Sequence, residues 1–331
     1  MIEFVFTIDY EIYGNGEGSL GELVHDPAEK LAEVFNKYQS KFVAFIEVAE
    51  LEMIEANRTD RAIDKVKHQI KKLYGDGFEL GLHLHPQWYN ARHENGKWLL
   101  DYSEYNLCAL PRERIAQVVQ RSMDYLRNVL GDPVFTPIAF RAGNWLFQPT
   151  KDAADILAQK GVKIDSSVIK GALQRNHGLD YRSACKNGYY WRFEEDVNLH
   201  DDDGRLIELP TYSMMVPIWE MITLKRVGMS QKMPSSPLRG IEKFRRYLDF
   251  LRLWYPLKMD FFRMTLSELT KMMDKLIHED HENPTVFRPI VAIGHTKDFI
   301  DLEVVEAFLS YLKARGVPVS TFAGVYHRCR Q

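Results

Sequence analysis

The sequence contains only three cysteines, Cys108, Cys185 and Cys329, which lie far apart in the chain. Small secreted proteins usually carry an even number of closely spaced cysteines, and structural zinc clusters carry them in pairs. The cysteine pattern therefore excludes a disulfide framework and a cysteine-based zinc cluster. A reducing compartment is the expected environment.

An excess of positive charge is also missing. The 43 Lys and Arg residues are balanced by 46 Asp and Glu residues, which gives a formal net charge of -3. A protein that binds nucleic acid normally presents a basic face to the phosphates. Nucleic-acid partners are therefore not expected.

Long apolar runs are the third absence. The first nine residues include no basic leader, no cleavage site and no run long enough to span a bilayer. The apolar stretch 214–222 is short and contains Pro217 and Glu220. We therefore expect a cytoplasmic protein without a membrane span. The sequence leaves open whether the chain forms a homo-oligomer.

Short runs rich in Val, Ile and Phe alternate along the chain with longer amphipathic stretches, which is the pattern of βαβ units. At 331 residues the chain suits a single α/β domain, a (β/α) barrel. We expect strands at residues 2–8, 41–46, 78–83, 137–140, 162–167, 206–209, 289–293 and 317–322. We expect helices at residues 27–38, 112–130, 152–160 and 302–314.

Two insertions interrupt this alternation. Residues 88–110 form a polar, aromatic-rich loop after the third strand, and residues 211–262 combine a long loop, 211–239, with a helical stretch, 241–254. Long loops in a compact domain are often lids or substrate-binding walls. A surface excursion or an oligomer contact explains them equally well. A single domain covering residues 1–331 accommodates both insertions.

Ionisable residues follow six of the expected strands, and in a parallel barrel the carboxyl ends of the strands open on one face. Each residue alone has an ordinary structural explanation, such as a turn residue, a core histidine or a partner for a surface charge. The coincidence at six strand ends favours a functional site. The residues are Asp9 and Glu11, His83 and His85, Arg141, Asp165, Glu208, and His295.

His83 and His85 are the central pair. Side chains at positions i and i+2 of an extended segment point to the same side, so the two imidazoles can converge on one cation. A hydrolytic metal site also needs a carboxylate ligand, which Asp9 or Glu11 can supply. Two histidines at this spacing are a weak pattern without the other residues at the carboxyl ends of the strands, which form one rim of the barrel.

The ordered segments 7–11, 79–85, 140–143, 165–167 and 294–295 resemble the five motifs of the polysaccharide deacetylase superfamily, also called the NodB homology or carbohydrate esterase family 4 fold. The resemblance extends from residue 2 to about residue 323. It implies a distorted seven-stranded (β/α) barrel with helical insertions. This chain is a variant with an Asp-x-Glu and a His-x-His-Pro motif.

The resemblance implies a role for each matching residue. Asp9 is the expected general base, Arg141 the residue that orients it, His295 the general acid, and Asp165 the acidic residue that tunes His295. A divalent metal, most often Zn²⁺ with Co²⁺, Mn²⁺ or Ni²⁺ as alternatives, is expected to bind to Glu11, His83 and His85.

This chain departs from the family's motifs at two positions. Tyr10 replaces the usual second aspartate, and Gln87 stands where the second histidine is usually found. The sequence therefore leaves open whether His85 or Gln87 completes the metal site. The candidate substrate-binding residues are Gln87, Trp88, Asn144, Trp145, Glu208 and Tyr212.

The expected function is that of a metal-dependent hydrolase that removes the N-acetyl group from a sugar, a precursor of cell-surface polysaccharide. The first alternative is an amidohydrolase of a small non-sugar amide that works with or without metal. The second alternative is a catalytically silent sugar-binding homologue, which the departures at Tyr10 and Gln87 favour.

Overall fold

The computed structural model describes residues 1–221, 252–298 and 301–330. A curled sheet forms its centre, with the strand order β10-β11-β7-β6-β3-β2-β1-β14, and β15 pairs with β1. All neighbouring strands are parallel except β10 and β11. The strands are β1 (Ile2–Tyr10), β2 (Val43–Glu47), β3 (Glu79–Leu84), β6 (Ala139–Ala142), β7 (Ile164–Asp165), β10 (Trp191–Phe193), β11 (Leu206–Glu208), β14 (Arg288–His295) and β15 (Val319–Ser320).

Isolated bridges bring the two ends of this sheet together. Thr211, just after β11, pairs with Val291 in β14, and Asp260 pairs with Ile293. The strands thus curl into a barrel, and the expected (β/α) barrel is confirmed. Expected strands that lie at positions 2–8, 41–46 and 78–83 agree with β1, β2 and β3 to within a few residues.

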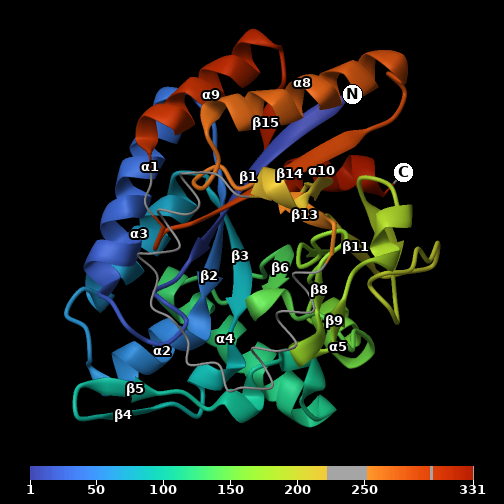
Figure 1. The fold of residues 1–331 in the computed structure, drawn as a ribbon. Helices are drawn as coiled ribbons and strands as arrows, with labels where there is room; N and C mark the ends of the chain where they lie inside the picture. The colour runs from blue at the N-terminus through green and yellow to red at the C-terminus, as the bar shows by residue number, and fades with distance from the viewer. Residues whose placement is uncertain (222–251, 299–300, 331) are drawn as a thin grey trace.

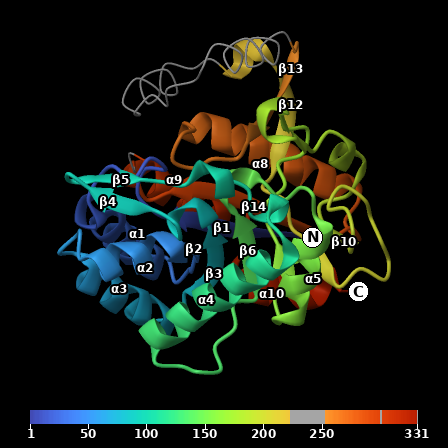
Figure 2. The ribbon, with the colours of Figure 1, turned by 90° about the horizontal axis from the view of Figure 1, so that it is seen from below.

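Helices surround the curled sheet on its outside (Figures 1 and 2). The helices expected at 112–130 and 302–314 are present with those limits. The α-helices in the described ranges are α1 (Asp26–Lys37), α2 (Val48–Asn57), α3 (Ile63–Gly75), α4 (Arg112–Leu130), α5 (Lys151–Gln159), α8 (Leu266–Glu282), α9 (Leu302–Ala314) and α10 (Phe322–Cys329).

The central strands are buried on both faces, as is usual for parallel sheets covered by helices. Every residue of β14 and every residue of β1 from Phe4 to Tyr10 is buried. Phe6 shows how strand and helix meet, because its ring contacts those of Phe35 in α1 and Phe308 in α9. This packing fixes the barrel and therefore the positions of the strand ends.

The first insertion forms a small hairpin. Its strands β4 (Arg92–Glu94) and β5 (Lys97–Leu99) are antiparallel and are joined by Asn95 and Gly96, which both have positive φ angles. An Asn-Gly pair adopts such angles readily, which is why it forms tight hairpin turns. In Figure 1 the hairpin lies at the lower edge of the molecule, near α2.

The second insertion contains two antiparallel strands, β12 (Ser213–Pro217) and β13 (Trp254–Lys258), which form a ribbon that projects from the body of the protein (Figure 2). The helical stretch predicted at 241–254 lies outside the described residues as far as residue 251. Its last residue, Trp254, belongs to β13, so the prediction is wrong there. Two further small strands, β8 (Leu173–Gln174) and β9 (Leu179–Asp180), form a separate hairpin.

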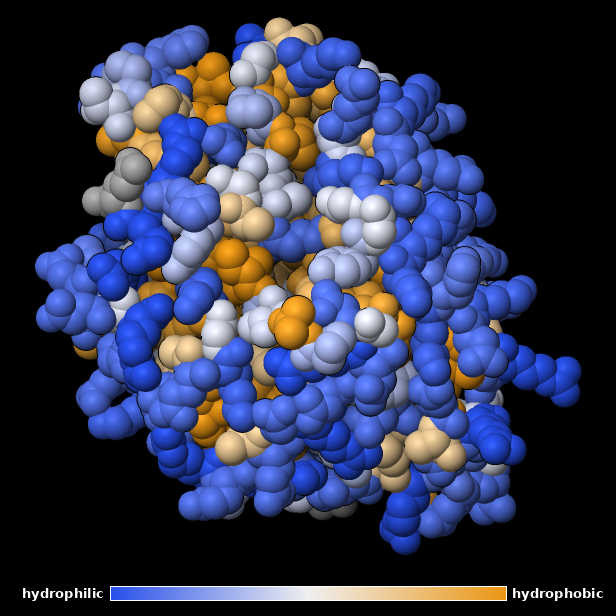
Figure 3. Space-filling model, turned by 180° about the vertical axis from the view of Figure 1, so that it is seen from behind, coloured by the Kyte–Doolittle hydropathy of each residue, from blue (hydrophilic) through white to orange (hydrophobic). Residues whose placement is uncertain are grey.

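The face opposite to that of Figure 1 is hydrophilic over most of its surface, with apolar side chains gathered at its centre and upper part (Figure 3). None of the helices in the described ranges is both long and apolar enough to cross a membrane.

Candidate active site

The carboxyl ends of β1, β3, β6 and β14 bring six of the predicted site residues together. Asp9 is the partner of His295 in the β1–β14 register, and His83 is the partner of Arg141 in the β3–β6 register. Asp9, His83 and Arg141 are almost completely buried, whereas His295 is 9% exposed. Glu11 and His85 directly follow β1 and β3 by one residue and lie at the same rim.

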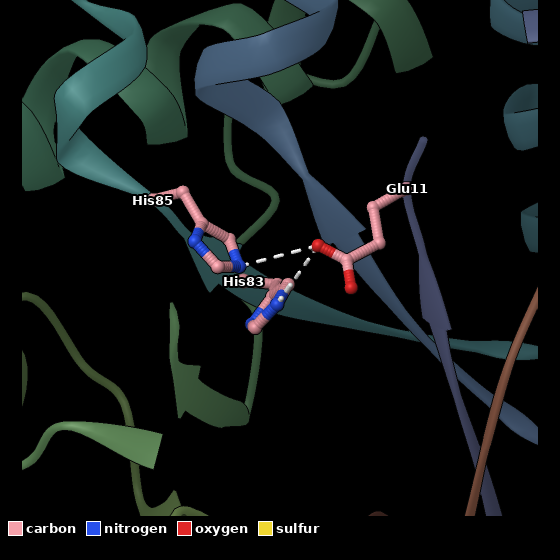
Figure 4. A group of neighbouring side chains, drawn as sticks. All are labelled: Glu11, His83 and His85. Carbon is pink, nitrogen blue, oxygen red and sulfur yellow. Dashed lines mark ion pairs between the residues drawn. The ribbon is translucent and has the colours of Figure 1, made fainter. Parts of the chain in front are cut away.

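Glu11, His83 and His85 converge on one point (Figure 4). Nε2 of His83 lies 3.6 Å and Nε2 of His85 lies 3.2 Å from the same oxygen, Oε2 of Glu11. The ligand-capable atoms of the three residues all lie within 4.8 Å of one another. The two-residue spacing of the histidines therefore does place both imidazoles on one carboxylate.

Both histidines are held from behind. Nδ1 of His83 lies 2.9 Å from the backbone oxygen of Arg141, to which it can only donate, so in the neutral ring the lone pair is on Nε2. Nδ1 of His85 lies 3.2 Å from the side-chain amides of both Gln87 and Asn144. Gln87 thus lies behind His85, and it is His85 that faces Glu11.

The approach of Asn144 to His85 depends on unusual backbone angles. Asn144 and Trp145 have φ angles of 57° and 65°, which are uncommon for residues other than glycine and are found preferentially at functional sites. Next to them, a Cβ atom on Gly143 would lie 2.5 Å from the backbone oxygen of Leu84 and 2.8 Å from the His85 ring. Glycine is therefore required at position 143 for the strand to pass so close to His85.

Arg141 anchors Asp9. Its Nη1 donates a 2.6 Å hydrogen bond to Oδ1 of Asp9, and its other nitrogens bind to Thr7 and Ser166. Burial by itself would raise the pKa of Asp9, but the Arg141 guanidinium and the nearby His83 and His295 hold it below its usual value. Asp9 is therefore an ionised carboxylate whose second oxygen, Oδ2, remains available.

His295 faces that second oxygen. Its Nε2 lies 3.4 Å from Oδ2 of Asp9, and its Nδ1 lies 3.5 Å from Oδ2 of Asp298. Asp298 is itself bound by Arg263 at 2.8 Å. Burial would raise the pKa of Asp298, but His295 and Arg263 bring it below its usual value. Asp298 is the carboxylate behind His295, and the sequence analysis did not include it.

Asp165, which the motif resemblance places behind His295, has other contacts in the structure. It is fully buried, accepts a 2.7 Å hydrogen bond from Ser167, and pairs with Glu208 of the neighbouring strand β11. Glu208 is fully buried, and burial raises its pKa well above the usual range. The two residues form a buried carboxyl pair, which leaves Glu208 inaccessible to a substrate.

The remaining candidate substrate residues lie in different surroundings. Trp88 is almost completely buried against Trp98. Trp145 is half-buried and lies between Arg141 and Lys258, 5.4 Å and 5.2 Å from their charged groups. Tyr212 lines a separate cavity of about 360 Å³ with Lys170, Cys185 and Tyr189, so the structure does not bring it to the rim.

Two further ionisable groups lie at the rim and were not among the predicted site residues. Lys297 donates a 2.6 Å hydrogen bond to Oε1 of Glu11, the oxygen that faces away from the histidines. Glu47 ends β2 and is fully buried. Burial and the neighbouring Glu50 and Glu11 raise the pKa of Glu47 well above its usual value. Glu47 directly follows an apolar run, which is the same signal that identified the other strand-end residues.

No protein-family model matches the chain, and no curated protein matches it in sequence. Solved structures do match it in fold. A protein assigned as a polysaccharide deacetylase from Mycobacterium smegmatis aligns with 99% of this chain and 90% of its own length, at 13% identity and a TM-score of 0.55.

A GH57 branching enzyme from Thermococcus kodakaraensis aligns with 98% of this chain and 70% of its own length, at 10% identity and a TM-score of 0.54. Puue allantoinase aligns with 98% of this chain and 89% of its own length, at 11% identity and a TM-score of 0.51. Identities of this size show a shared fold, whereas the reaction has to be inferred from the site. The chain therefore shares its fold with these solved proteins.

Proposed function

We propose that this protein is a metal-dependent hydrolase that removes the N-acetyl group from a sugar in the formation of cell-surface polysaccharide. The observation that carries the proposal is the convergence of Glu11, His83 and His85 on one point, next to Asp9 and His295. The sugar and its pathway rest on the resemblance of the motifs to the polysaccharide deacetylases.

The three candidate ligands fit a tetrahedral divalent ion. Ligand atoms about 2.0–2.1 Å from a zinc ion are separated from one another by roughly 3.3 Å in a tetrahedron. The separations of 3.2 Å and 3.6 Å between the histidine nitrogens and Oε2 of Glu11 agree with that value. Two histidines and one carboxylate also form a common ligand set of catalytic zinc sites, which leaves one position open.

The amide of Gln87 supports the same assignment. Its Oε1 is buried and has no hydrogen-bond partner among the described residues, while its nitrogen faces Nδ1 of His85. Exchanging the two amide positions, which ordinary structures cannot distinguish, lets Oε1 accept a hydrogen bond from Nδ1. Nε2 of His85 is then free to bind an ion, and Gln87 orients His85 as residues behind a ligand commonly do.

Glu11, His83 and His85 would hold a divalent ion, which would polarise an amide carbonyl and lower the pKa of a water molecule. Asp9 is placed to accept a proton at Oδ2, because Arg141 binds only to Oδ1. Its lowered pKa keeps Asp9 in the basic form near neutral pH.

His295 is placed to donate a proton to the departing amine. Its Nε2 lies beside Oδ2 of Asp9, so the acid and the base border the same space. Oδ2 of Asp298 lies 3.5 Å from Nδ1 on the opposite side of the ring, where its charge is placed to orient the ring, as a carboxylate behind a catalytic histidine does in other hydrolases.

A second candidate function is the hydrolysis of a small amide without metal. Lys297 favours it, because its ammonium group already neutralises Glu11 in the absence of an ion. The fold shared with an allantoinase is compatible with it.

Metal analysis of the purified protein, followed by acetate release from a panel of N-acetylated sugars, tests the two candidates. We expect about one divalent ion per chain and metal-dependent acetate release, both lost in His83→Ala and His85→Ala. Hydrolysis that survives removal of the metal would favour the second candidate. If the purified protein contains no metal and releases no acetate, the leading proposal is eliminated.

A further inference from the structure

The cavity of about 360 Å³ that Tyr212 lines lies away from the candidate active site. Its walls come from the loop after β11, from the segment 185–189 and from the start of β14. Pro289 of β14 lines it, and six residues of extended strand, about 20 Å, separate Pro289 from His295. A ligand in this cavity would therefore be distinct from a substrate at the rim of the barrel.

Lys170 supplies the positive charge of this cavity. Its Nζ donates hydrogen bonds to the backbone oxygens of Asn187, at 2.6 Å, and Gly188, and it lies 5.2 Å from the centre of the Trp191 ring. An ammonium group has three donors, and the third has no acceptor among the described residues. The described lining of the cavity contains no carboxylate. Lys170 is therefore a partly buried cation with one free donor and no counter-ion in the lining.

Thr211 places a second polar group in the same cavity. The residue is fully buried and lines the cavity, and its Oγ1 has no hydrogen-bond partner among the described residues. A buried hydroxyl without a partner is unfavourable and often marks the place of a bound water, ion or ligand. Ile169, the residue before Lys170, forms a bridge with Thr211. The free hydroxyl and the ammonium group are thus held on neighbouring segments.

The rest of the lining is largely apolar and aromatic. The hydroxyl of Tyr189 is already bound to Glu279 at 2.6 Å, so its ring is the part that remains for a ligand. A volume of about 360 Å³ is at the lower end of the range of small-molecule sites. A ligand with a second negative charge would have to bury that charge against apolar walls, which is costly. These walls are formed by Tyr189, Pro210, Tyr212, Met215 and Pro289.

We propose that this cavity binds a small monocarboxylate with an apolar or aromatic body. The carboxylate accepts hydrogen bonds from the third donor of Lys170 and from the hydroxyl of Thr211, and the body packs against the proline and tyrosine side chains. Hydrogen bonds between an ammonium group and a carboxylate are among the strongest in proteins, because both partners are charged. The inference does not depend on the proposed function, since it uses none of the residues at the rim.

Cys185 allows binding in this cavity to be measured directly. It is exposed and lines the cavity, whereas Cys108 and Cys329 are buried and burial raises the pKa of both of their thiols. A Cβ atom on Gly171, the residue after Lys170, would lie 3.5 Å from Sγ of Cys185. N-ethylmaleimide should therefore modify Cys185, and a ligand beside Lys170 should slow this modification.

The full-length chain is labelled in the presence of a chelator, so that no metal ion at the rim can bind the probes. The probes are benzoate, its neutral analogue benzamide, and acetate. We expect benzoate to slow the labelling of Cys185. Benzamide lacks the charge and acetate lacks the apolar body, so each should need an about tenfold higher concentration for the same protection.

Lys170→Met removes the ammonium group and is expected to raise the benzoate concentration needed for protection at least about tenfold. Lys151→Met, at an exposed lysine paired with Glu195, is the matched control and should behave like the wild type. Thr211→Val provides a second variant, because Oγ1 has no partner whose loss could disturb the fold. We expect Thr211→Val to weaken protection by benzoate severalfold.

Equal protection by benzoate and benzamide would overturn the assignment of a carboxylate ligand, as would full protection in Lys170→Met. Equal protection by benzoate and acetate would indicate an adventitious anion only and would overturn the apolar part of the site. If benzoate does not slow the labelling of Cys185 at all, the site is overturned. Acetate release is not measured, so each of these outcomes is independent of the proposed deacetylase activity.

Discussion

The ammonium group of Lys297 lies 2.6 Å from Oε1 of Glu11, while both histidines face Oε2 of the same carboxylate. Burial would lower the pKa of Lys297, but Glu11 raises it above the usual value. The pKa of Glu11 is correspondingly well below its usual range, although burial alone would raise it. Oε1 of Glu11 therefore binds to the Lys297 ammonium group, while Oε2 of the same carboxylate faces the candidate metal position.

Replacement of Lys297 by methionine is expected to tighten binding of Zn²⁺ about tenfold, because a like charge close to the ion is removed. Chelator competition measures the affinity directly. Lys151→Met, at an exposed lysine paired with Glu195, is the matched control. Unchanged or weaker binding in Lys297→Met would mean that Lys297 mainly positions Glu11.

Gln87 and the two histidines are expected to differ in their effect on the metal. His83→Ala and His85→Ala each remove a ligand, so the purified variants should contain little metal. Gln87→Ala removes only a contact behind His85 and should weaken affinity by about 10–100-fold. Metal content and affinity distinguish the two outcomes. If Gln87→Ala loses metal completely and His85→Ala retains it, Gln87 is the ligand.

Asp298 and Asp165 provide a direct comparison of the two carboxylates proposed to act on His295. His295→Ala should lower kcat by about 10²–10⁴-fold, the usual contribution of a general acid. We expect Asp298→Asn to lower kcat with little change in KM, because the ring of His295 loses its fixed orientation. Asp165→Asn should have a smaller effect at equal metal content. The reverse order would restore the role that the motif resemblance assigned to Asp165.

Lys170 gives a prediction for the pH dependence of stability. Its ammonium group donates hydrogen bonds to the backbone oxygens of Asn187 and Gly188, and burial lowers its pKa to about 8. In the unfolded chain a lysine has a pKa of about 10.4, so the unfolded state binds more protons between these values. The contribution of Lys170 to the free energy of unfolding should therefore rise from pH 8 to about pH 10.4.

Denaturant unfolding of the wild type and Lys170→Met across this pH range measures that contribution. The difference between the two proteins should be constant below pH 7 and should shift in favour of the wild type as the pH rises. Lys151→Met, whose side chain is 68% exposed, should run parallel to the wild type. Parallel curves for Lys170→Met as well would contradict the shifted pKa.

Local sequence signals predicted a large part of the barrel. The helix at 112–130 was found with its limits because Gly131 ends it in the left-handed conformation, which is the usual role of a glycine at that position. Two other elements also carry local signals. Thr265 and Glu268 form a capping box that begins α8, and Asn95-Gly96 forms the turn between β4 and β5.

The sequence by itself determined that Asp9, His83, Arg141 and His295 lie together. Each ends a buried apolar run, and parallel strands carry their ends to one rim whatever the loops do. The two-residue alternation along a strand likewise determined that His83 and His85 point to the same side.

Only the tertiary structure decided which charged side chains contact these site residues. Lys297 and Asp298 lie in a loop after β14 whose course is set by packing, and no periodicity predicts which side chain turns inward. Asp165 ends a strand like the others, yet its register with Glu208 directs it to a buried partner. Strand periodicity fixes the side to which a residue points, whereas its nearest charge depends on three-dimensional packing.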